Sequence, residues 1–160
     1  MRNGKRKLFS YSIACILTFL IVSLSLLPQE EREMVVANIL EVHGTTIVIG
    51  NNQTCKAIVA QTSPERARNI LLGMHGIIPE RPTTHDTIAE IFRQFNLTLE
   101  KVTIEKFSGN YYYGYMYIRS KNKMVKLDVM PSDGIAVALR LRAPIYLNKT
   151  LLEEVGENVC

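Results

Sequence analysis

Two short segments of the sequence carry side chains that can do acid–base chemistry. His85 and Asp86 follow two threonines in "PTTHD", and Asp133 follows Pro131 and Ser132 in "DVMPSDG". A histidine can move a proton near neutral pH, and a carboxylate can act as a base or bind a divalent metal. Both segments also have the composition of helix starts, where Asp, Ser and Thr cap free backbone N–H groups. Catalysis and helix capping are therefore both open for each aspartate.

Three helices are predicted to position these side chains. Residues 63–76 open with Ser-Pro-Glu, close with glycine and carry one apolar face. A second helix follows the threonines, with Thr84 as its expected N-cap and apolar residues at i, i+3, i+4 and i+7. The third helix runs from Ser132 to about Leu141 and is apolar on all sides, which predicts burial. Ser132 or Asp133 is expected to satisfy the free N–H groups at its start.

The rest of the body is predicted to form strands and turns. Val- and Ile-rich runs indicate strands, and Ser-Gly-Asn at 108–110 predicts a hairpin turn. The expected strands are 34–40, 45–49, 54–60, 101–107, 111–119 and 124–129, with a short one after Pro144. This order predicts an α+β fold, with a mixed sheet and three main helices in a single domain at 34–147. A linker at 29–33 precedes it, and a helical tail at 148–160, capped by Asn148, follows it.

The excess positive charge of the chain lies at its start. The formal net charge is +4 at pH 7, and four cations precede residue 8. From residue 28 onward, Lys plus Arg and Asp plus Glu both number fifteen. The body therefore lacks the global basic footprint that is typical of nucleic-acid-binding domains. A local basic run remains, for which a solvated hairpin is the simplest interpretation: Arg119, Lys121, Lys123 and Lys126.

Residues 8–27 are twenty residues without a charge, long enough to span a bilayer as a helix. Together with the basic start they form the expected anchor, residues 1–28. The cations before the apolar run and the acids after it place the body outside the cytoplasm. We therefore predict a single-pass protein of the cell membrane. The alternative is a cleaved signal peptide and a secreted protein.

Two cysteines lie in the body, Cys55 and Cys160. They can pair in an oxidising compartment. We expect them to remain unbridged, because the end of the chain is expected to be mobile.

Four tyrosines alternate along one predicted strand and so share one face of the sheet. They could stack unpaired bases, or pack beneath a helix or against another subunit. The four are Tyr111, Tyr113, Tyr115 and Tyr117.

The order of three segments, "PERPTTHD", "YYYGYMYI" and "DVMPSDGIAVALRLRAPI", resembles the bifunctional nuclease domain family. The resemblance runs from about residue 34 to 147. Met130 stands where the family usually has an arginine, and Gly134 where it has an alanine. A lost arginine could remove a phosphate-binding group.

The resemblance implies a small, oligomeric α+β domain with nuclease activity on RNA or DNA. The expected catalytic residues are His85, Asp86 and Asp133. The expected substrate-binding residues are Arg81, Ser132 and Arg140. A divalent metal, Mg²⁺ or Mn²⁺, would be held by carboxylates, of which the candidates are Asp86, Asp128 and Asp133. The competing hypothesis is a non-catalytic binding or assembly module at the membrane, attached through residues 8–27.

Overall fold

A computed structural model describes residues 33–51 and 53–160, which fold as one unit with a single sheet of eight strands and four helices. The strands are β1 (Met34–His43), β2 (Thr46–Asn51), β3 (Lys56–Gln61), β4 (Thr98–Ser108), β5 (Tyr111–Ser120), β6 (Lys123–Val129), β7 (Ile145–Asn148) and β8 (Glu157–Asn158). The helices are α2 (Pro64–His75), α3 (Thr84–Gln94), α4 (Pro131–Leu141) and α5 (Lys149–Val155). The predicted α+β fold with a mixed sheet is confirmed for this part of the chain.

The predicted membrane anchor, residues 8–27, lies outside the described residues. Within the described part of the chain, no helix is both long enough and apolar enough to cross a bilayer.

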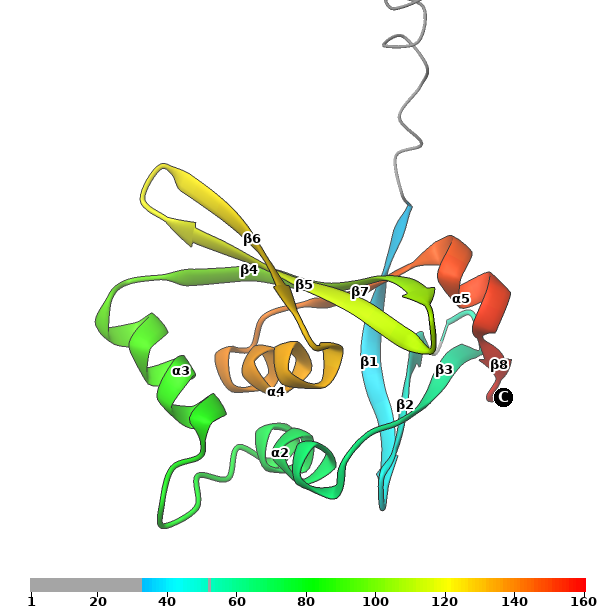
Figure 1. The fold of residues 1–160 in the computed structure, drawn as a ribbon, viewed down its shortest axis with the longest axis horizontal. Helices are drawn as coiled ribbons and strands as arrows, with labels where there is room; N and C mark the ends of the chain where they lie inside the picture. The colour runs from blue at the N-terminus through cyan, green and yellow to red at the C-terminus, as the bar shows by residue number, and fades with distance from the viewer. Residues whose placement is uncertain (1–32, 52) are drawn as a thin grey trace, which may run out of the picture. The chain divides into compact units, whose positions relative to one another are not determined.

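The strand order is β6-β5-β4-β7-β1-β2-β3-β8. All neighbouring strands are antiparallel except β4 and β7, which are parallel. The short strand β7 pairs with β4 on one side and β1 on the other, and it joins the β4–β6 half of the sheet to the β1–β3 half. Figure 1 shows these two halves meeting around the helices.

Helix α4 lies at the centre of the domain. It packs against β4 and β5 on one side and against α2 and α3 on the other (Figure 1). Five consecutive residues, 134–138, are buried, so the predicted burial on all sides is confirmed. A Cβ atom at Gly134 would come within 3.1 Å of side-chain methyls of Val102 and Val129. The glycine therefore lets the start of α4 lie close to the sheet.

The predicted boundaries of the first helix are confirmed. The Ser63 hydroxyl accepts a hydrogen bond from the Arg66 backbone N–H, and Pro64 is the first helical residue. Gly76 ends α2 with a positive φ of 63°, a conformation that favours glycine. The predicted turn at 108–110 is also present between β4 and β5.

Tyr113, Tyr115 and Tyr117 lie on the face of the sheet opposite α4, because Gly114 and Met116 between them face α4. Lysine side chains lie over the rings of these three tyrosines, whereas Tyr111, at the start of β5, lines a cavity together with residues of α4. Lys126 Nζ lies 3.8 Å from the ring centre of Tyr115, and Lys101 Nζ lies 4.8 Å from that of Tyr117. Lys126 also donates to both carboxylate oxygens of Glu105, at 3.0 and 3.1 Å. Burial alone would raise the pKa of Glu105, but hydrogen bonds from Lys126 and neighbouring hydroxyls outweigh it and lower the pKa. In the described part of the chain, it is lysine side chains that lie over this face.

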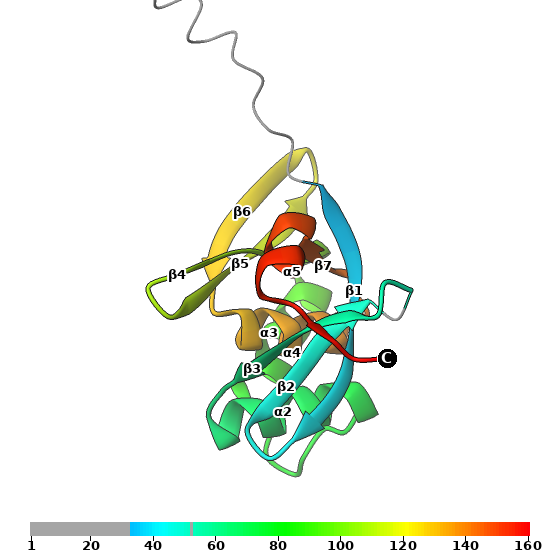
Figure 2. The same ribbon diagram turned by 90° about the vertical axis from the view of Figure 1, so that its right-hand side faces the viewer.

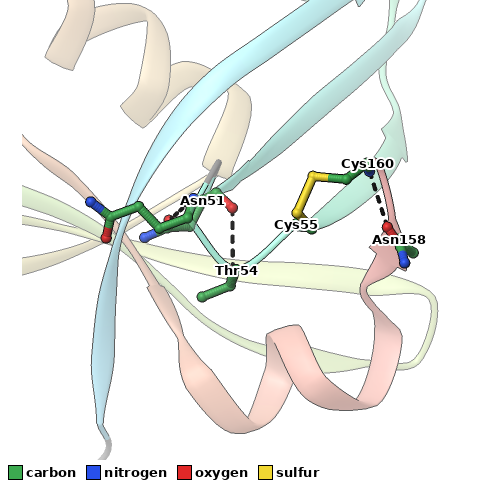
Figure 3. The surroundings of a disulfide bond; sticks show 6 residues. Asn51, Thr54, Cys55, Asn158 and Cys160 are labelled. Atoms are coloured by element: carbon green, nitrogen blue, oxygen red, sulfur yellow. Dashed lines mark hydrogen bonds between the residues drawn. A yellow bond between two sulfur atoms is a disulfide. The ribbon is translucent and has the colours of Figure 1, made fainter.

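Cys55 and Cys160 form a disulfide, so the expectation that they stay unbridged was wrong (Figure 3). Their Cα atoms lie 5.2 Å apart. The C-terminal end is held in place because β8 adds to the edge of the sheet beside β3 (Figure 2). The Val159 N–H also donates to the Cys55 carbonyl at 2.9 Å. The expected helix of this tail, capped by Asn148, is present as α5. The residues after it pair with the sheet, so the end of the chain is tied down and is not mobile as assumed.

Removing the disulfide is expected to destabilise the domain. The bridge joins residues 105 positions apart, and closing so long a loop lowers the conformational entropy of the unfolded chain. A protein carrying both Cys55→Ser and Cys160→Ser should lose about 2–4 kcal/mol of unfolding free energy. Denaturant unfolding of the oxidised wild type and of the variant would measure this. The reduced wild type should match the variant; equal stability of the oxidised wild type and the variant would contradict the prediction.

Candidate active site

His85 and Asp133 meet where the first turn of α3 faces the first turn of α4. The His85 Nε2 atom lies 3.2 Å from Asp133 Oδ1, although the residues are 48 positions apart in the chain. The His85 side chain is 13% exposed and that of Asp133 is 35% exposed. Two of the three expected catalytic residues are therefore in contact, and the aspartate is the more accessible of the two.

The start of α3 fixes the position of His85. Thr83 is the N-cap, one residue before the expected Thr84. Its hydroxyl accepts from the Asp86 N–H, and the Asp86 carboxylate accepts from the Thr83 N–H at 2.8 Å, which completes a capping box. Thr83 is preferred to Thr84 as the N-cap because Asp86 is then the third helical residue. From that position a carboxylate can accept a hydrogen bond from the backbone N–H of the N-cap. His85 consequently becomes the second helical residue.

Asp133 does not cap its helix, contrary to expectation, and neither does Ser132. Helix α4 begins at Pro131, so the N-cap is Met130, and no side chain makes a capping hydrogen bond there. Proline is favoured at the first helical position because its fixed φ suits a helix and because an N–H at that position would have no partner within the helix. Asp133 is therefore the third helical residue, and its carboxylate points to His85 instead of back to the backbone.

A third side chain of the site, Arg66 on α2, was not predicted from the sequence. Its Nε atom lies 3.7 Å from Asp133 Oδ1, and its side chain is 39% exposed. Its terminal guanidinium nitrogens have no hydrogen-bond partner within the described residues. The sequence did contain a hint, because a cation in the first turn of a helix opposes the helix dipole. Arg66 occupies such a position just after the Ser63 cap.

These three side chains line one open pocket of about 620 Å³, together with Glu65 of α2. The pocket floor is apolar and includes Ile88 of α3 and Met116, Val129 and Val137. Concave, mostly apolar pockets with a few convergent polar groups are the usual form of small-ligand and active sites. Here the convergent groups are one imidazole, one carboxylate and one guanidinium.

The tautomer of His85 follows from its surroundings. Its Nδ1 atom is buried and has no hydrogen-bond partner among the described residues. A proton on Nδ1 would be a buried N–H without a partner, which is costly. The tautomer with the proton on Nε2 donates to Asp133 and leaves only the Nδ1 acceptor without a partner. This tautomer fits the site best.

Asp86, the third expected catalytic residue, lies in a separate buried ion pair. Its Oδ1 accepts from Arg140 Nε at 2.5 Å, and the two side chains are only 6% and 7% exposed. Arg140 Nη1 also donates to the carbonyls of Asn69 and Ala136 at 2.9 and 2.8 Å. Burial alone would raise the pKa of Asp86, but hydrogen bonds from Arg140 and Thr83 lower it. The Asp86 carboxylate and the Arg140 guanidinium are thus bonded to each other and to buried protein groups, and they do not face the pocket of Asp133.

The remaining predicted site residues are dispersed. Arg81 is exposed and lines a neighbouring hollow that also reaches His85. Ser132 lines a different cavity, which shares Arg66 with the active-site pocket. Asp128 is exposed on β6, opposite Tyr115 of β5. Within the described residues, no three His, Cys, Asp or Glu side chains lie close enough to hold a metal ion. The structure therefore does not bring Asp86, Asp128 and Asp133 together.

Comparison with known proteins identifies the domain. The profile of the bifunctional nuclease domain matches residues 47–159. This match covers more than half of the 160 residues. The chain belongs to the bifunctional nuclease domain family. The predicted resemblance is confirmed. The match begins at residue 47 instead of about 34, which leaves β1 outside it, and it extends beyond residue 147 to include α5 and β8.

Two relatives in this family share about a quarter to a third of their aligned residues with the chain. An uncharacterized protein of Mycobacterium tuberculosis is 33% identical over 91 residues, which is 56% of this chain and 53% of the relative. Bifunctional nuclease 1 of Oryza sativa subsp. indica is 27% identical over 93 residues, which is 56% of this chain and 28% of the relative. The aligned part thus spans about half of the mycobacterial protein and less than a third of the rice protein.

Replacing Asp86 by asparagine is expected to destabilise the domain strongly. The change leaves the Arg140 guanidinium buried without a counter-charge, and breaking a buried pair in this way costs about 3–5 kcal/mol. Denaturant unfolding near neutral pH would measure the loss. The matched control is Asp128→Asn, the same change at an exposed carboxylate, which should shift stability by about 0.5 kcal/mol or less. Similar stabilities for the two variants would refute a structural role for Asp86.

The same pair predicts a pH dependence. Because the pKa of Asp86 is lowered in the folded state, its contribution to stability is complete above the ordinary pKa of 3.8. That contribution is lost as the pH falls through the lowered folded pKa. The Asp86→Asn protein should therefore show a smaller loss of stability on acidification below about pH 4 than the wild type.

Proposed function

We propose that this domain is a nuclease that hydrolyses phosphodiester bonds in RNA or DNA, with Asp133 as the reacting base. The observation that carries the proposal is the convergence of Asp133, His85 and Arg66 in one open pocket. Membership of the bifunctional nuclease domain family and the names of the rice relatives support the same reaction class.

Asp133 is the group best placed to meet a substrate. Its Oδ1 faces His85 and Arg66, whereas Oδ2 has no hydrogen-bond partner within the described part of the chain. Oδ2 can accept a proton from a water molecule as that water attacks phosphorus. The new bond joins the water oxygen to phosphorus, and the bond to the leaving oxygen breaks. The proton held on Asp133 can then pass to the leaving oxygen, which restores the carboxylate.

Arg66 supplies the charge that the reaction needs. A phosphodiester is negatively charged, and negative charge builds on the non-bridging oxygens during attack. A guanidinium with free terminal nitrogens can bind two such oxygens at once. Its placement beside Asp133 puts the phosphate next to the base, and it offsets the repulsion between carboxylate and phosphate.

His85 acts in this proposal as a positioning residue. Its Nδ1 is buried and its Nε2 is directed at Asp133, so neither nitrogen is turned freely toward the pocket. The Nε2–H···Oδ1 hydrogen bond fixes the orientation of the carboxylate. This differs from the expectation that His85 itself moves the proton, and mutation can distinguish the two roles.

Asp133→Asn is expected to reduce kcat/KM on labelled single-stranded RNA or DNA by a factor of about a hundred or more, because it removes the base. His85→Gln keeps an N–H donor toward Asp133 and should lose much less, whereas His85→Ala should lose more. If His85 transferred the proton, His85→Gln would be as inactive as Asp133→Asn. Thermal melts would show that each protein is folded, and assays with and without chelator would test the expected Mg²⁺ or Mn²⁺.

The control for Asp133→Asn is Asp128→Asn, which removes an exposed carboxylate five residues earlier and should remain active. Full activity of a folded Asp133→Asn protein would remove Asp133 from the mechanism. A wild type that cleaves neither nucleic acid under any condition would favour the non-catalytic assembly module.

We further propose that the domain works outside the cytoplasm. The Cys55–Cys160 disulfide supports this location, because structural disulfides persist in oxidising compartments. The uncharged run at 8–27, preceded by cations and followed by acids, is the sequence feature behind the proposal.

Protease added to intact spheroplasts should therefore digest residues 33–160. A cytoplasmic protein probed in the same sample should survive, which controls for lysis. Digestion of the domain only after lysis would reverse the proposed orientation.

A further inference from the structure

A second cavity, of about 300 Å³, adjoins the active-site pocket and is not used by the proposed reaction. Its floor is made of buried isoleucines from β2, β3, β4 and α4: Ile47, Ile49, Ile58, Ile104 and Ile135. Its size is at the lower end of the range for small-ligand sites, about 300–1,000 Å³. The cavity therefore has room for one small ring or group, with apolar contacts on its floor.

The two cavities meet at Arg66 and at the first turn of α4. Arg66 lines both of them. Pro131 and Ser132 line the apolar cavity, while the next residue, Asp133, lines the active-site pocket. A phosphate bound by Arg66 would therefore lie between the base Asp133 and the entrance to the apolar cavity.

The rim of the apolar cavity combines large exposed apolar side chains with unpaired polar ones. Tyr111 is 71% exposed and Met130 is 54% exposed, and both line it. The side chains of Thr62, Asn110 and Ser132 also line it, and none of them makes a side-chain hydrogen bond within the described residues. A flat group with apolar faces and a polar edge is the ligand that such a lining fits.

We propose that this cavity is a nucleobase subsite: it takes one base of the substrate beside Tyr111 and Met130, with the adjoining phosphate on Arg66. The inference rests on the proposed nuclease function and adds a recognition element to it. Bases stack on tyrosine rings with little regard to sequence, and the polar rim can reach the base edge. A base that is paired in a duplex cannot enter, so the substrate class is single-stranded nucleic acid or a frayed end.

Binding of nucleoside monophosphates tests the subsite apart from catalysis, because they contain no diester bond to cleave. Isothermal titration calorimetry would compare adenosine 5′-monophosphate with ribose 5-phosphate, which has the phosphate and sugar but no base. We expect the nucleotide to bind about tenfold more tightly or better, the scale of a stacked base. Equal affinities would overturn the proposal without any variant being needed.

Substitutions in the lining of the cavity test whether the base of the nucleotide binds there. Tyr111→Ala and Met130→Ala should each weaken nucleotide binding severalfold and leave ribose 5-phosphate binding unchanged. Arg66→Gln should weaken both ligands, because it removes the phosphate contact. The matched control is Phe95→Ala, which removes an aromatic ring of similar exposure, 72%, at the end of α3. Nucleotide affinity that is insensitive to both Tyr111→Ala and Met130→Ala would overturn the proposal.

The outcomes separate this inference from the proposed function. If Asp133→Asn is fully active but nucleotide binding depends on Tyr111, the subsite stands and the mechanism fails. If Asp133→Asn is inactive while Tyr111→Ala and Met130→Ala change neither nucleotide affinity nor the KM for single-stranded substrate, the mechanism stands and the subsite fails. If Tyr111→Ala instead abolishes a dimer seen by sedimentation, and nucleotide affinity is unchanged, the cavity belongs to a contact between copies and the proposal is wrong.

Discussion

The buried ion pair between Asp86 and Arg140 is the interaction on which the arrangement of the helices depends. Arg140 belongs to α4, Asp86 to α3, and the Asn69 carbonyl that Arg140 also reaches belongs to α2. One guanidinium therefore contacts α2, α3 and α4. Burying two charges is expensive, and it is tolerated only where geometry and additional hydrogen bonds compensate. The capping threonine and two carbonyls provide that compensation here.

The ion pair also determines where His85 points. His85 and Asp86 are consecutive residues in the first turn of α3, so their side chains leave the helix about 100° apart. Once Asp86 faces Arg140, the rotation of α3 about its axis is fixed, and His85 faces Asp133. Asp133 and Arg140 are seven residues apart on α4, which is about 10 Å along a helix. The start of α3 must therefore lie alongside α4 between these two positions. The buried ion pair therefore positions His85 and Asp133, the pair proposed to act in the reaction.

The sequence predicted the features that depend on local pattern. The apolar surface of α4, the Ser63 cap and the 108–110 turn are each encoded within a few residues, and all are present. The cap of α3 was misplaced by one residue and that of α4 by two or three, because several neighbouring residues can cap and tertiary contacts select among them. At α3 the selection follows from Asp86, which closes the capping box on Thr83.

Features that depend on distant partners were not predictable in the same way. The role of Asp86 depends on Arg140, 54 residues later, and the disulfide depends on β8 pairing with β3 across the sheet edge. Arg66 could be recognised as a site residue only once α2 and α4 were seen to pack together. The periodicity or spacing of residues within one segment does not indicate which distant segment will pack against it.

The location of the cations, rather than their number, explains how a neutral body can be suited to a polyanionic substrate. On the tyrosine face, Lys126 is held by Glu105 and by two tyrosine rings, and Lys101 lies against Tyr117. Burial alone would lower the pKa of Lys126, but its hydrogen bonds with Tyr117 and Glu105 raise it, so its charge is fixed within the protein. A phosphate approaching that face would have to compete with Glu105.

Arg66 differs from these lysines because its terminal nitrogens have no partner within the described residues and it lies where two cavities meet. A single well-placed guanidinium can orient one phosphodiester without a broad basic surface, and the apolar cavity beside it supplies contact area that does not depend on charge. Recognition of this kind would be less sensitive to salt than binding through many phosphate contacts, because few counterions are released.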